Sequence, residues 1–583
     1  MIKILKNLRK KDILLILIST LLIVFQVYLD LKLPDYMSSI TTLVKTTGSH
    51  IKDILINGLY MLLCAGGSLI SAIIVGYLVS LISSNFSMNL RSKLFRKVET
   101  FGLEEIKKFK TSSLITRTTN DITNIEMLLS MGMQMLIKAP ITAIWAILKI
   151  LNKNIEWSMI TGIAVVVLLI SIIFLLIIVF PKFKIVQKLI DNINGLTREH
   201  LNGIRVIRAF NAEKFQEDKF ENVNNILTKT QLFNQKIMSI LSPIMYLVMN
   251  MLSLSIYFVG SYLINNSLMA NKITMFSDMV VFSSYAMQVI MSFLMISMIF
   301  IMYPRASVSA SRINEVLSTE SNIKDGDFFG VTKENGTVEF KNVSFKYPDS
   351  EEYLLKDISF KVNTGETIAF IGSTGSGKST LINLVPRFYD VTDGEILIDG
   401  INVKRYKLDV LHKKIGYVSQ KAIMFNDSIK SNVTYGTKKK VDIKKLEESI
   451  RVAQGDFVLK MDKKYNSNIS QGGTNISGGQ KQRLSIARAI YKDPEIYIFD
   501  DSFSALDYKT DYALRMELKK YTKDATIMIV AQRIGTILNA DKIVVLDKGI
   551  CVGMGTHKEL MKNCKIYKEI AYSQLSKEEL SNA

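Results

Sequence analysis

The segment 372–379 holds the residues of this chain that are best suited to bind a phosphate. It reads Gly-Ser-Thr-Gly-Ser-Gly-Lys-Ser, follows the apolar run 366–371 and precedes the helix-compatible residues 380–384. Glycines at this spacing let backbone N–H groups wrap around phosphates, and the N-terminus of the following helix adds its positive dipole. We predict a nucleotide site made by Gly372, Ser373, Thr374, Gly375, Ser376, Gly377, Lys378, Ser379 and Thr380, in which Lys378 reaches the β- and γ-phosphates.

A second apolar run, 496–500, ends in Asp500. A buried strand that delivers one carboxylate at its C-terminal end commonly supplies the Mg²⁺ side of such a phosphate loop. We therefore expect the Ser379 hydroxyl and the Asp500 carboxylate to face Mg²⁺.

The composition indicates which kind of molecule carries this site. The chain has 583 residues, a mean hydropathy of +0.21, 48% hydrophobic residues and 22% charged residues, which is too apolar for a soluble enzyme and too charged for a wholly embedded protein. Three widely spaced cysteines exclude a disulfide scaffold and a CxxC metal knuckle. The net charge of +20 needs no nucleic-acid partner, because no basic-aromatic platform accompanies it. The excess of lysine over arginine is typical of an AT-rich bacterial genome.

The apolar residues concentrate in six long stretches before residue 304. They cover 13–33, 54–84, 129–151, 158–180, 237–264 and 275–303, and each reaches the length of about 20 residues that spans a lipid bilayer. Lysine and arginine collect in the N-terminal segment and in the loops 87–128 and 181–236. The positive-inside rule places both termini and these two loops in the cytoplasm, where we expect the membrane helices to continue.

The character of the sequence changes after the last stretch. Residues 313–337 are polar and read as a linker, and short strands at 338–340 and 343–345 are then followed by interleaved helices and strands. We predict an α-helical six-span membrane domain over 1–312 and an α/β domain with a largely parallel sheet over 338–583.

Between the phosphate loop and Asp500 lies 476–483, Ile-Ser-Gly-Gly-Gln-Lys-Gln-Arg, which resembles the signature motif of ATP-binding-cassette (ABC) ATPases. The resemblance continues at the position of the adenine-stacking aromatic, in the Q-loop and in the D-loop. It implies ATP and Mg²⁺ as cofactors, Ser379, Gln420 and Asp500 at the metal, and an ABC half-transporter that dimerises, so that the signature contacts ATP held by the partner chain. The residues concerned are Tyr347, Gln420, the signature residues Ser477, Gly478, Gly479 and Gln480, and the D-loop residues Ser504, Ala505, Leu506 and Asp507.

Two positions depart from the family pattern. The residue after the Walker B aspartate is normally Glu but here is Asp501, and the switch position, normally His, is Gln532. Asp is one methylene shorter than Glu, and Gln has no ionisable ring. Neutral change within one lineage, with a homodimer of reduced activity, is one interpretation. The other is a degenerate catalytic site, as in one chain of heterodimeric bacterial ABC exporters.

The sequence says little about the identity of the transported substrate. Export of amphipathic drugs or peptides and flipping of a lipid both fit, whereas six spans exclude a non-transport cassette ATPase. Methionines over 238–302 either fill space between helices or form an adaptable pocket. Lys138, with Gln134 one turn away, either lines the substrate path or lies in a snorkelling or cytoplasmic position. Within the membrane half, Phe109, Arg117, Asp121 and 199–210 resemble the surroundings of the two coupling helices, and 305–312 resembles the end of the last helix.

Overall fold

The computed structural model describes residues 1–46, 50–151, 155–268, 271–330, 332, 334–437 and 440–575. The chain divides into two compact units. The first, the membrane unit, comprises Met1–Glu99 and Thr111–Thr319. The second, the cassette unit, comprises Thr100–Lys110 and Glu320–Ala583. Each unit is described by itself below.

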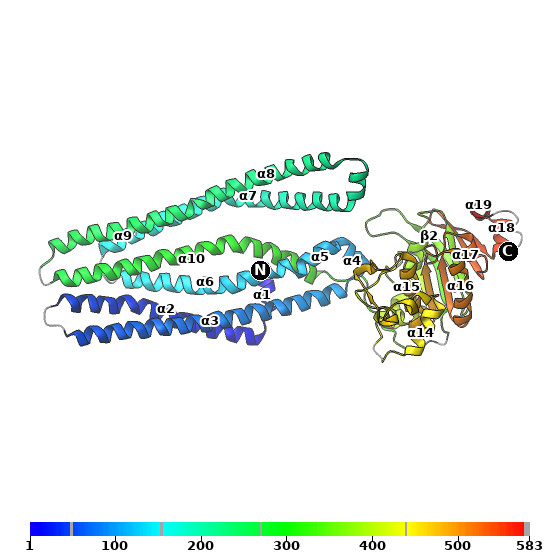
Figure 1. The fold of residues 1–583 in the computed structure, drawn as a ribbon, viewed down its shortest axis with the longest axis horizontal. Coiled ribbons are helices and arrows are strands. Elements are labelled where there is room, and N and C mark those ends of the chain that lie inside the picture. The colour runs from blue at the N-terminus through cyan, green and yellow to red at the C-terminus, as the bar shows by residue number, and fades with distance from the viewer. Residues whose placement is uncertain are drawn as a thin grey trace. The chain divides into compact units, whose positions relative to one another are not determined.

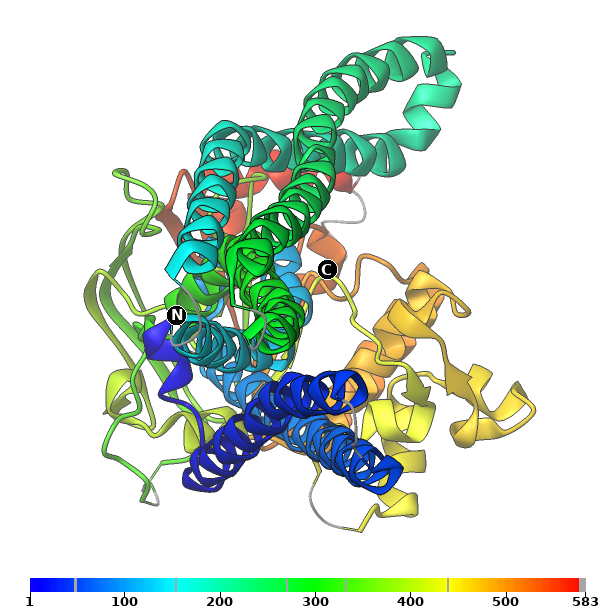
Figure 2. The same cartoon turned by 90° about the vertical axis from the view of Figure 1, so that its left-hand side faces the viewer.

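The membrane unit is built from helices (Figure 1). Helix α6 packs along α10 and α2 packs along α3, while α7 and α8 form a hairpin that projects away from the other helices in Figures 1 and 2. The helices are α1 (Ile2–Leu5), α2 (Lys10–Lys45), α3 (Ile51–Glu99), α5 (Thr111–Thr118), α6 (Asn120–Leu151), α7 (Ile155–Ala209), α8 (Glu213–Ser239), α9 (Leu241–Asn266) and α10 (Lys272–Ser318).

Six helical segments of the described chain are long and apolar enough to cross a membrane, which confirms the six predicted stretches. The expected helical extensions are also confirmed, since α3 runs to Glu99 and α7 runs to Ala209. The predicted fifth stretch is interrupted, because α8 ends at Ser239 and α9 begins at Leu241. Residues 152–154, between the third and fourth predicted stretches, lie outside the described residues.

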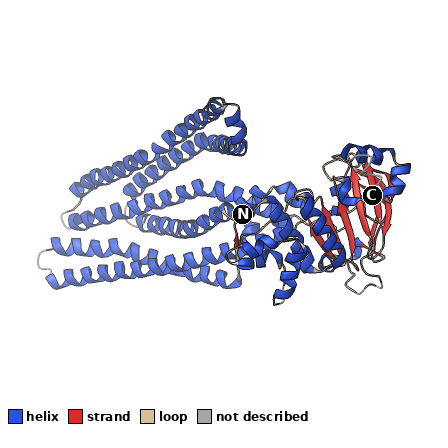
Figure 3. Ribbon diagram, turned by 45° about the vertical axis from the view of Figure 1, so that its right-hand side comes forward, coloured by secondary structure: helices blue, strands red, loops and turns tan. Residues whose placement is uncertain are grey.

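The cassette unit contains a six-stranded sheet, ordered β12-β11-β3-β10-β9-β6, and a four-stranded sheet, ordered β2-β1-β4-β5 (Figure 3). Strands β7 and β8 form a separate two-stranded sheet. The strands are β1 (Val338–Phe345), β2 (Leu355–Val362), β3 (Thr367–Gly372), β4 (Asp393–Ile398), β5 (Ile401–Asn402), β6 (Ile415–Val418), β7 (Asp427–Ser428), β8 (Asn468–Ile469), β9 (Ile496–Asp500), β10 (Thr526–Val530), β11 (Lys542–Asp547) and β12 (Ile550–Gly555).

Helices cover the strands of the cassette unit. They are α4 (Leu103–Phe109), α11 (Lys378–Leu384), α12 (Leu408–Lys414), α13 (Ile429–Val433), α14 (Ile443–Val452), α15 (Gly478–Lys492), α16 (Tyr508–Tyr521), α17 (Ile534–Ile537), α18 (His557–Asn563) and α19 (Lys565–Gln574), with 3-10 turns η2 (Val403–Arg405), η3 (Asp456–Lys460), η4 (Lys464–Asn466) and η5 (Gln471–Gly473).

The expected largely parallel sheet is confirmed, because β3, β6, β9, β10 and β11 are parallel and β12 alone runs antiparallel at its edge. The two short strands predicted at 338–345 form one strand, β1, whose register shifts between Phe340 and Val343. Asn342 takes a positive φ of 50° at this bulge, and its N–H donates to the Ser359 hydroxyl. Such a bulge inserts a residue without ending the strand.

Residues 320–328, here called the strap, lie along the cassette although their composition is that of a linker. The Gly326 and Phe328 N–H groups donate to the carbonyls of Tyr406 and Arg405, and Phe328 pairs with Tyr406 as a parallel bridge. Arg387 adds a hydrogen bond to the Lys324 carbonyl. A Cβ atom on residue 326 would lie 2.1 Å from the Arg405 carbonyl oxygen, so glycine is required there.

Candidate functional site

The phosphate loop joins β3 to α11, as the sequence predicts. The strand is buried at Ile368–Ile371, and the loop residues Ser373, Thr374 and Gly375 are exposed. Gly375 and Gly377 have positive φ values of 83° and 94°, which L-residues adopt rarely. A Cβ atom on Gly375 would meet nothing within 4 Å, so the loop leaves open space on this side. This curved backbone has the form that receives an anion at a helix N-terminus.

Lys378 closes the loop on itself. Its Nζ donates to the carbonyl oxygens of Gly372, at 2.8 Å, and Ser373, at 2.7 Å. Ser376 is fully buried beneath the loop, and its hydroxyl lies 3.4 Å from the same Nζ. Burial lowers the pKa of the Lys378 ammonium, and the carboxylates of Asp501 and Asp500 partly oppose that effect. The ammonium is therefore held at the loop, ready to exchange carbonyl oxygens for phosphate oxygens.

The predicted metal side is assembled from two elements. Ser379, in the first turn of α11, donates to Asp500 Oδ1 at 2.7 Å, and Asp500 ends the buried strand β9. Burial raises the pKa of the Asp500 carboxyl. Gln420, which the family resemblance assigns to the metal, instead directs its Nε2 to Asp501 Oδ2 at 3.2 Å.

Asp501 lies where three predicted residues meet. Gln532 donates from Nε2 to Asp501 Oδ2 at 2.7 Å, and Gln420 donates to the same oxygen. The backbone of Asp501 has a φ of +47°, and its N–H donates to the Val530 carbonyl. Burial raises the pKa of the Asp501 carboxyl, while hydrogen bonds from Gln420 and Ser504 oppose that rise. The oxygen nearest the amides is thus already engaged by two donors.

The register of the sheet explains this meeting. Strands β9 and β10 are parallel, with Asp500 opposite Val530, so the residues that follow each strand emerge side by side. Asp501 and Gln532 are 31 positions apart in the sequence, yet the carboxyl ends of their strands share one edge.

Tyr347, the expected adenine-stacking residue, lies beside the phosphate loop. Its hydroxyl is 3.0 Å from the Thr380 hydroxyl of α11. Its ring makes edge contacts with Phe345 and Tyr389, and Lys107 of α4 lies 5.3 Å from the ring centroid. Tyr389 and Lys107 belong to no recognisable motif, so the sequence alone does not point to them.

The signature and D-loop residues lie on the cassette surface. Ser477 caps α15, and its hydroxyl and the Gln480 side chain form reciprocal capping bonds. Ser477 and Gly478 are exposed, and a Cβ atom on Gly478 would meet nothing within 4 Å. No hydrogen bond or ion pair between described residues joins 477–480 to the phosphate loop of this chain.

The D-loop lies beside the signature. Gly479 approaches the Ala505 carbonyl, where a Cβ atom would lie 3.3 Å from the oxygen. Ser504 and Ala505 are exposed, Leu506 is buried, and Asp507 caps α16 by accepting from the Thr510 N–H. Both motifs therefore present exposed polar groups that the phosphate loop of the same chain leaves unused.

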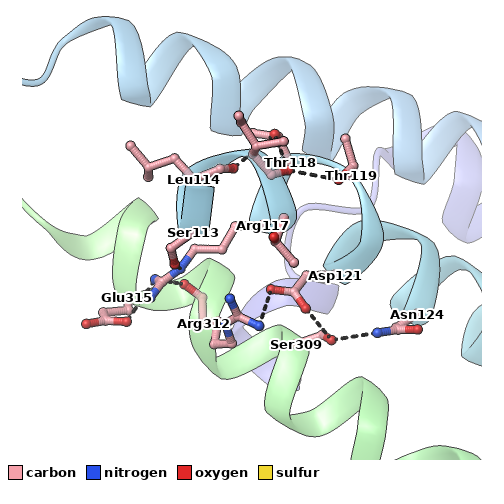
Figure 4. Close-up of polar contacts among 12 residues, drawn as sticks. Ser113, Leu114, Arg117, Thr118, Thr119, Asp121, Asn124, Ser309, Arg312 and Glu315 are labelled. Carbon is pink, nitrogen blue, oxygen red and sulfur yellow. Dashed lines mark hydrogen bonds and ion pairs between the residues drawn. The ribbon is translucent and has the colours of Figure 1, made fainter. Parts of the chain in front are cut away.

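Within the membrane unit, a polar network connects α5 and α6 to α10 (Figure 4). Arg117 donates to Glu315 at 2.8 Å and to the Arg312 carbonyl at 2.6 Å. Asp121 accepts from Ser309 at 2.9 Å and pairs with Arg312 at 3.4 Å. The structure thus brings together Arg117, Asp121 and 305–312, which the sequence singled out separately. Glu315 was missed because its type and spacing are ordinary for a helix surface.

The residues present fit a nucleoside triphosphate with Mg²⁺. An open loop of backbone N–H groups suits phosphates, and the hydroxyl and carboxylate of Ser379 and Asp500 are the hard oxygen donors that Mg²⁺ prefers. Within the described chain no group of three or more His, Cys, Asp or Glu residues could hold a metal without help. Mg²⁺ commonly takes only one or two ligands from the protein and completes its coordination with phosphate oxygens and water.

Comparison with known proteins supplies independent findings. Residues 355–504 match the family model "ABC transporter", and residues 16–293 match "ABC transporter transmembrane region". An uncharacterized ABC transporter ATP-binding protein of Mycobacterium tuberculosis is 37% identical over 89% of this chain and 88% of its own length. An ATP-dependent lipid A-core flippase of Wigglesworthia glossinidia brevipalpis is 31% identical over 87% of this chain and 86% of its own.

The fold has a solved counterpart. The structure of a bacterial Atm1-family ABC exporter with ATP bound superposes with a TM-score of 0.82 at 22% identity, covering 96% of this chain and 98% of that one.

Proposed function

This chain belongs to the ABC transporter family, and from that premise we propose that it is one half of a heterodimeric exporter whose own Walker site is degenerate. The chain is an integral membrane, ATP-hydrolysing transporter of the half-transporter type, and such chains act as dimers. The proposal adds that the partner is a different chain carrying the regular Glu and His, and that hydrolysis takes place mainly at the partner's site.

The proposal of a degenerate catalytic site is supported by the hydrogen bonds that Asp501 already accepts. A general base must reach the proton that it abstracts, within about 3 Å or through one water. Asp501 is one methylene shorter than Glu, and its Oδ2 accepts from both Gln532 and Gln420. Gln532 cannot ionise, so it can position a γ-phosphate but cannot exchange a proton with it.

In this proposal the residues that bind ATP and Mg²⁺ keep their function although the catalytic residues do not. Tyr347 and 372–380 bind ATP, Ser379, Asp500 and Gln420 surround Mg²⁺, and Ser477, Gly478, Gly479 and Gln480, with 504–507, face ATP held by the partner. Mg²⁺ neutralises phosphate charge when it is bound. The chain holds ATP as part of the closed dimer and completes the partner's active site with its regular signature. We propose 1–312 as the transmembrane domain, 313–337 as its linker and 338–583 as the cassette, with the cassette and both termini in the bacterial cytoplasm.

The proposed substrates are amphipathic or hydrophobic compounds, either drug-like molecules or peptides. Exposed methionines on α10, at Met291, Met295 and Met298, support a deformable apolar surface. A lipid or lipid-linked substrate is the second candidate, and it is supported by a relative whose name is that of a lipid A-core flippase.

ATP hydrolysis by the purified chain tests the proposal. We expect the protein alone to hydrolyse ATP slowly, and Asp501→Glu with Gln532→His to raise the rate by about tenfold or more, because a missing general base typically removes 10²–10⁴-fold. The paired change Asp524→Glu with Gln231→His, at exposed positions, is the control. Full transporter rates in the unaltered homodimer, or no response to the double substitution, would contradict degeneracy.

A further inference from the structure

Residues 531–534, here called the switch loop, are bound by a side chain of helix α19. Gln574 is the last residue of α19, and its Nε2 donates to the Gln532 carbonyl oxygen at 2.8 Å. The Ile534 N–H donates in turn to Gln574 Oε1, also at 2.8 Å. One side-chain amide therefore bonds to the backbone on both sides of Arg533, although it lies 40 positions beyond Ile534 in the sequence.

This pairing has the pattern of a parallel β-bridge. In a parallel ladder, the N–H of one residue donates to the carbonyl before its partner, and its C=O accepts from the N–H after its partner. The Gln574 amide makes the same two bonds around Arg533, whose backbone is extended with φ −106° and ψ 128°. Gln574 thus takes the place of a neighbouring strand just beyond β10, which ends at Val530.

An amide side chain suits this position because it carries a donor and an acceptor on one planar group. A carboxylate only accepts and an ammonium only donates, so neither could serve both backbone groups. Turning the amide over would place its oxygen against the Gln532 carbonyl and its NH₂ group against the Ile534 N–H. The two backbone groups therefore also determine the orientation of the Gln574 amide.

Helix α19 is anchored in the core of the cassette. Its residues Tyr567 and Ala571 are fully buried, and the Tyr567 hydroxyl lies 2.8 Å from Nδ1 of His557 in α18. The helix contacts α17, which begins at Ile534 (Figure 1). Gln574 follows Ala571 by three residues, which is close to one helical turn. The position of its backbone is therefore set by the core, while its side chain is exposed and reaches the switch loop.

Two contacts of the candidate site start from the residues that Gln574 holds. Gln532 directs its Nε2 to Asp501 Oδ2 at 2.7 Å, and Arg533 directs a guanidinium nitrogen to the Ser504 carbonyl of the D-loop at 3.4 Å. Neighbouring side chains of an extended segment point to opposite sides. A shift of this backbone would therefore move both side chains away from their partners.

We propose that Gln574 is the positioning residue of the switch loop and holds Gln532 where its amide faces Asp501 and the γ-phosphate of bound ATP. Gln574 does not touch the nucleotide and acts through the backbone of 532–534. The inference deepens the proposed function, because it rests on the γ-phosphate contact given there to Gln532. Since ADP lacks that phosphate, the preference of the site for ATP over ADP depends on Gln574.

Nucleotide binding to the full chain in detergent tests this role. AMP-PNP, which resists hydrolysis but has a γ-phosphate, and ADP each displace a fluorescent ATP analogue in the presence of Mg²⁺. We expect Gln574→Met, which is similar in length but has no amide, to weaken AMP-PNP binding by about fivefold or more, because a hydrogen bond to a charged phosphate is weakened. ADP binding should not change. Tyr572→Met, at an exposed position of the same helix, is the matched control and should change neither affinity.

A second substitution shows whether Gln574 acts through Gln532. Gln532→Ala should weaken AMP-PNP binding with the same selectivity, and Gln574→Met should then add nothing, because residues that act as a unit have non-additive effects. Hydrogen exchange provides a readout that needs no nucleotide. In peptides that cover 531–537, the Ile534 amide should exchange about fivefold faster in Gln574→Met than in Tyr572→Met, because its acceptor is gone.

Equal weakening of AMP-PNP and ADP binding, additive effects of the two substitutions, or unchanged exchange at Ile534 would each overturn the positioning role. The proposed function can fail separately. Full transporter rates of ATP hydrolysis by the unaltered chain, together with the selective effect of Gln574→Met, would contradict degeneracy alone. Slow hydrolysis by the unaltered chain, together with an equal effect of Gln574→Met on both nucleotides, would contradict the role of Gln574 alone.

Discussion

Asp500 illustrates at the residue scale how burial prepares a carboxyl for a cation. It lies at the end of a buried strand, accepts from Ser379, and has a raised pKa because burial disfavours the charged form. A bound divalent cation would favour the charged form and reverse that shift. The charged carboxylate of Asp500 is therefore destabilised by burial while the site holds no cation, and a bound cation would stabilise it.

This argument gives a pH-dependent prediction. The folded pKa of Asp500 is raised above its unfolded value, so the charged carboxyl destabilises the folded state at neutral pH, and protonation relieves this as pH falls toward 3.8. We expect Asp500→Asn to raise the thermal midpoint of the nucleotide-free protein slightly at pH 7 and to remove the extra stabilisation that Mg²⁺ gives with ATP. The gain should shrink as the pH is lowered from 7 toward 3.8 in thermal unfolding experiments.

The exposed residue Asp524 supplies the control, since Asp524→Asn should leave the midpoint and its pH dependence unchanged. A midpoint for Asp500→Asn that is lower than that of the unaltered protein at every pH would show that the hydrogen bond from Ser379 outweighs desolvation.

At the scale of elements, the strap shows how a polar segment can be part of a folded unit. Its N–H groups pair with the carbonyls of Arg405 and Tyr406, and Asn322 donates to the carboxylates of Glu104 and Glu105 on α4. The strap thus holds α4 to the cassette by directional bonds.

Gly326→Ala should loosen this attachment. The added Cβ would lie 2.1 Å from the Arg405 carbonyl oxygen, so backbone must move and the two pairing bonds weaken. We expect a loss of about 2 kcal/mol, in the range of strained backbone substitutions, and faster cleavage in the strap by limited proteolysis. Gly330→Ala is the matched control, because its Cβ would only touch the Phe328 ring at 3.4 Å. Equal cleavage of the two variants would contradict the assigned role of the strap.

The network between α6 and α10 gives a second prediction at this scale. The side chain of Asp121 is 6% exposed, whereas that of Glu315 is 54% exposed, although each pairs with an arginine. Asp121→Ala removes the partner of Ser309 and Arg312 and should cost about 2 kcal/mol, while Glu315→Ala should cost less than about 1 kcal/mol. Thermal unfolding of the two variants in detergent measures the difference, and equal shifts would contradict the importance of burial.

The elements differ in how far the sequence determines them. The six spans follow from stretches long enough to cross a bilayer, and the phosphate loop follows from the local spacing of its glycines. The bond between Gln532 and Asp501 depends on the register of β9 and β10, which local sequence does not encode. The strap was read as a linker because its composition is polar, whereas its structure comes from backbone bonds to residues about 80 positions away.

At the scale of the whole molecule, the exposed signature makes a prediction about pairing. In a head-to-tail dimer each phosphate loop needs the signature of the other chain. In the Asp501→Glu, Gln532→His background, Lys378→Ala and Ser477→Arg should each abolish ATP hydrolysis. A mixed dimer of the two variants contains one intact composite site out of two. Because about half of the dimers in a random 1:1 mixture are mixed, the mixture should recover about a quarter of the activity of the background.

Co-expression of the two variants with different affinity tags, followed by tandem purification, isolates the mixed dimer. ATPase activity near half that of the background is then expected. Co-expression of Lys378→Ala with itself under both tags is the control. No recovery in the mixed dimer would show that each chain uses its own signature.

The cassette unit is discontinuous, since it takes Thr100–Lys110 from one place in the chain and Glu320–Ala583 from another. During synthesis α4 leaves the ribosome about 200 residues before the strap that binds it, and domains generally fold in the order in which they are made. The second unit therefore cannot be finished until the intervening helices have been synthesised. The order of synthesis thus fixes an order of folding, in which the membrane helices are made first and the cassette is completed last, when the strap reaches α4.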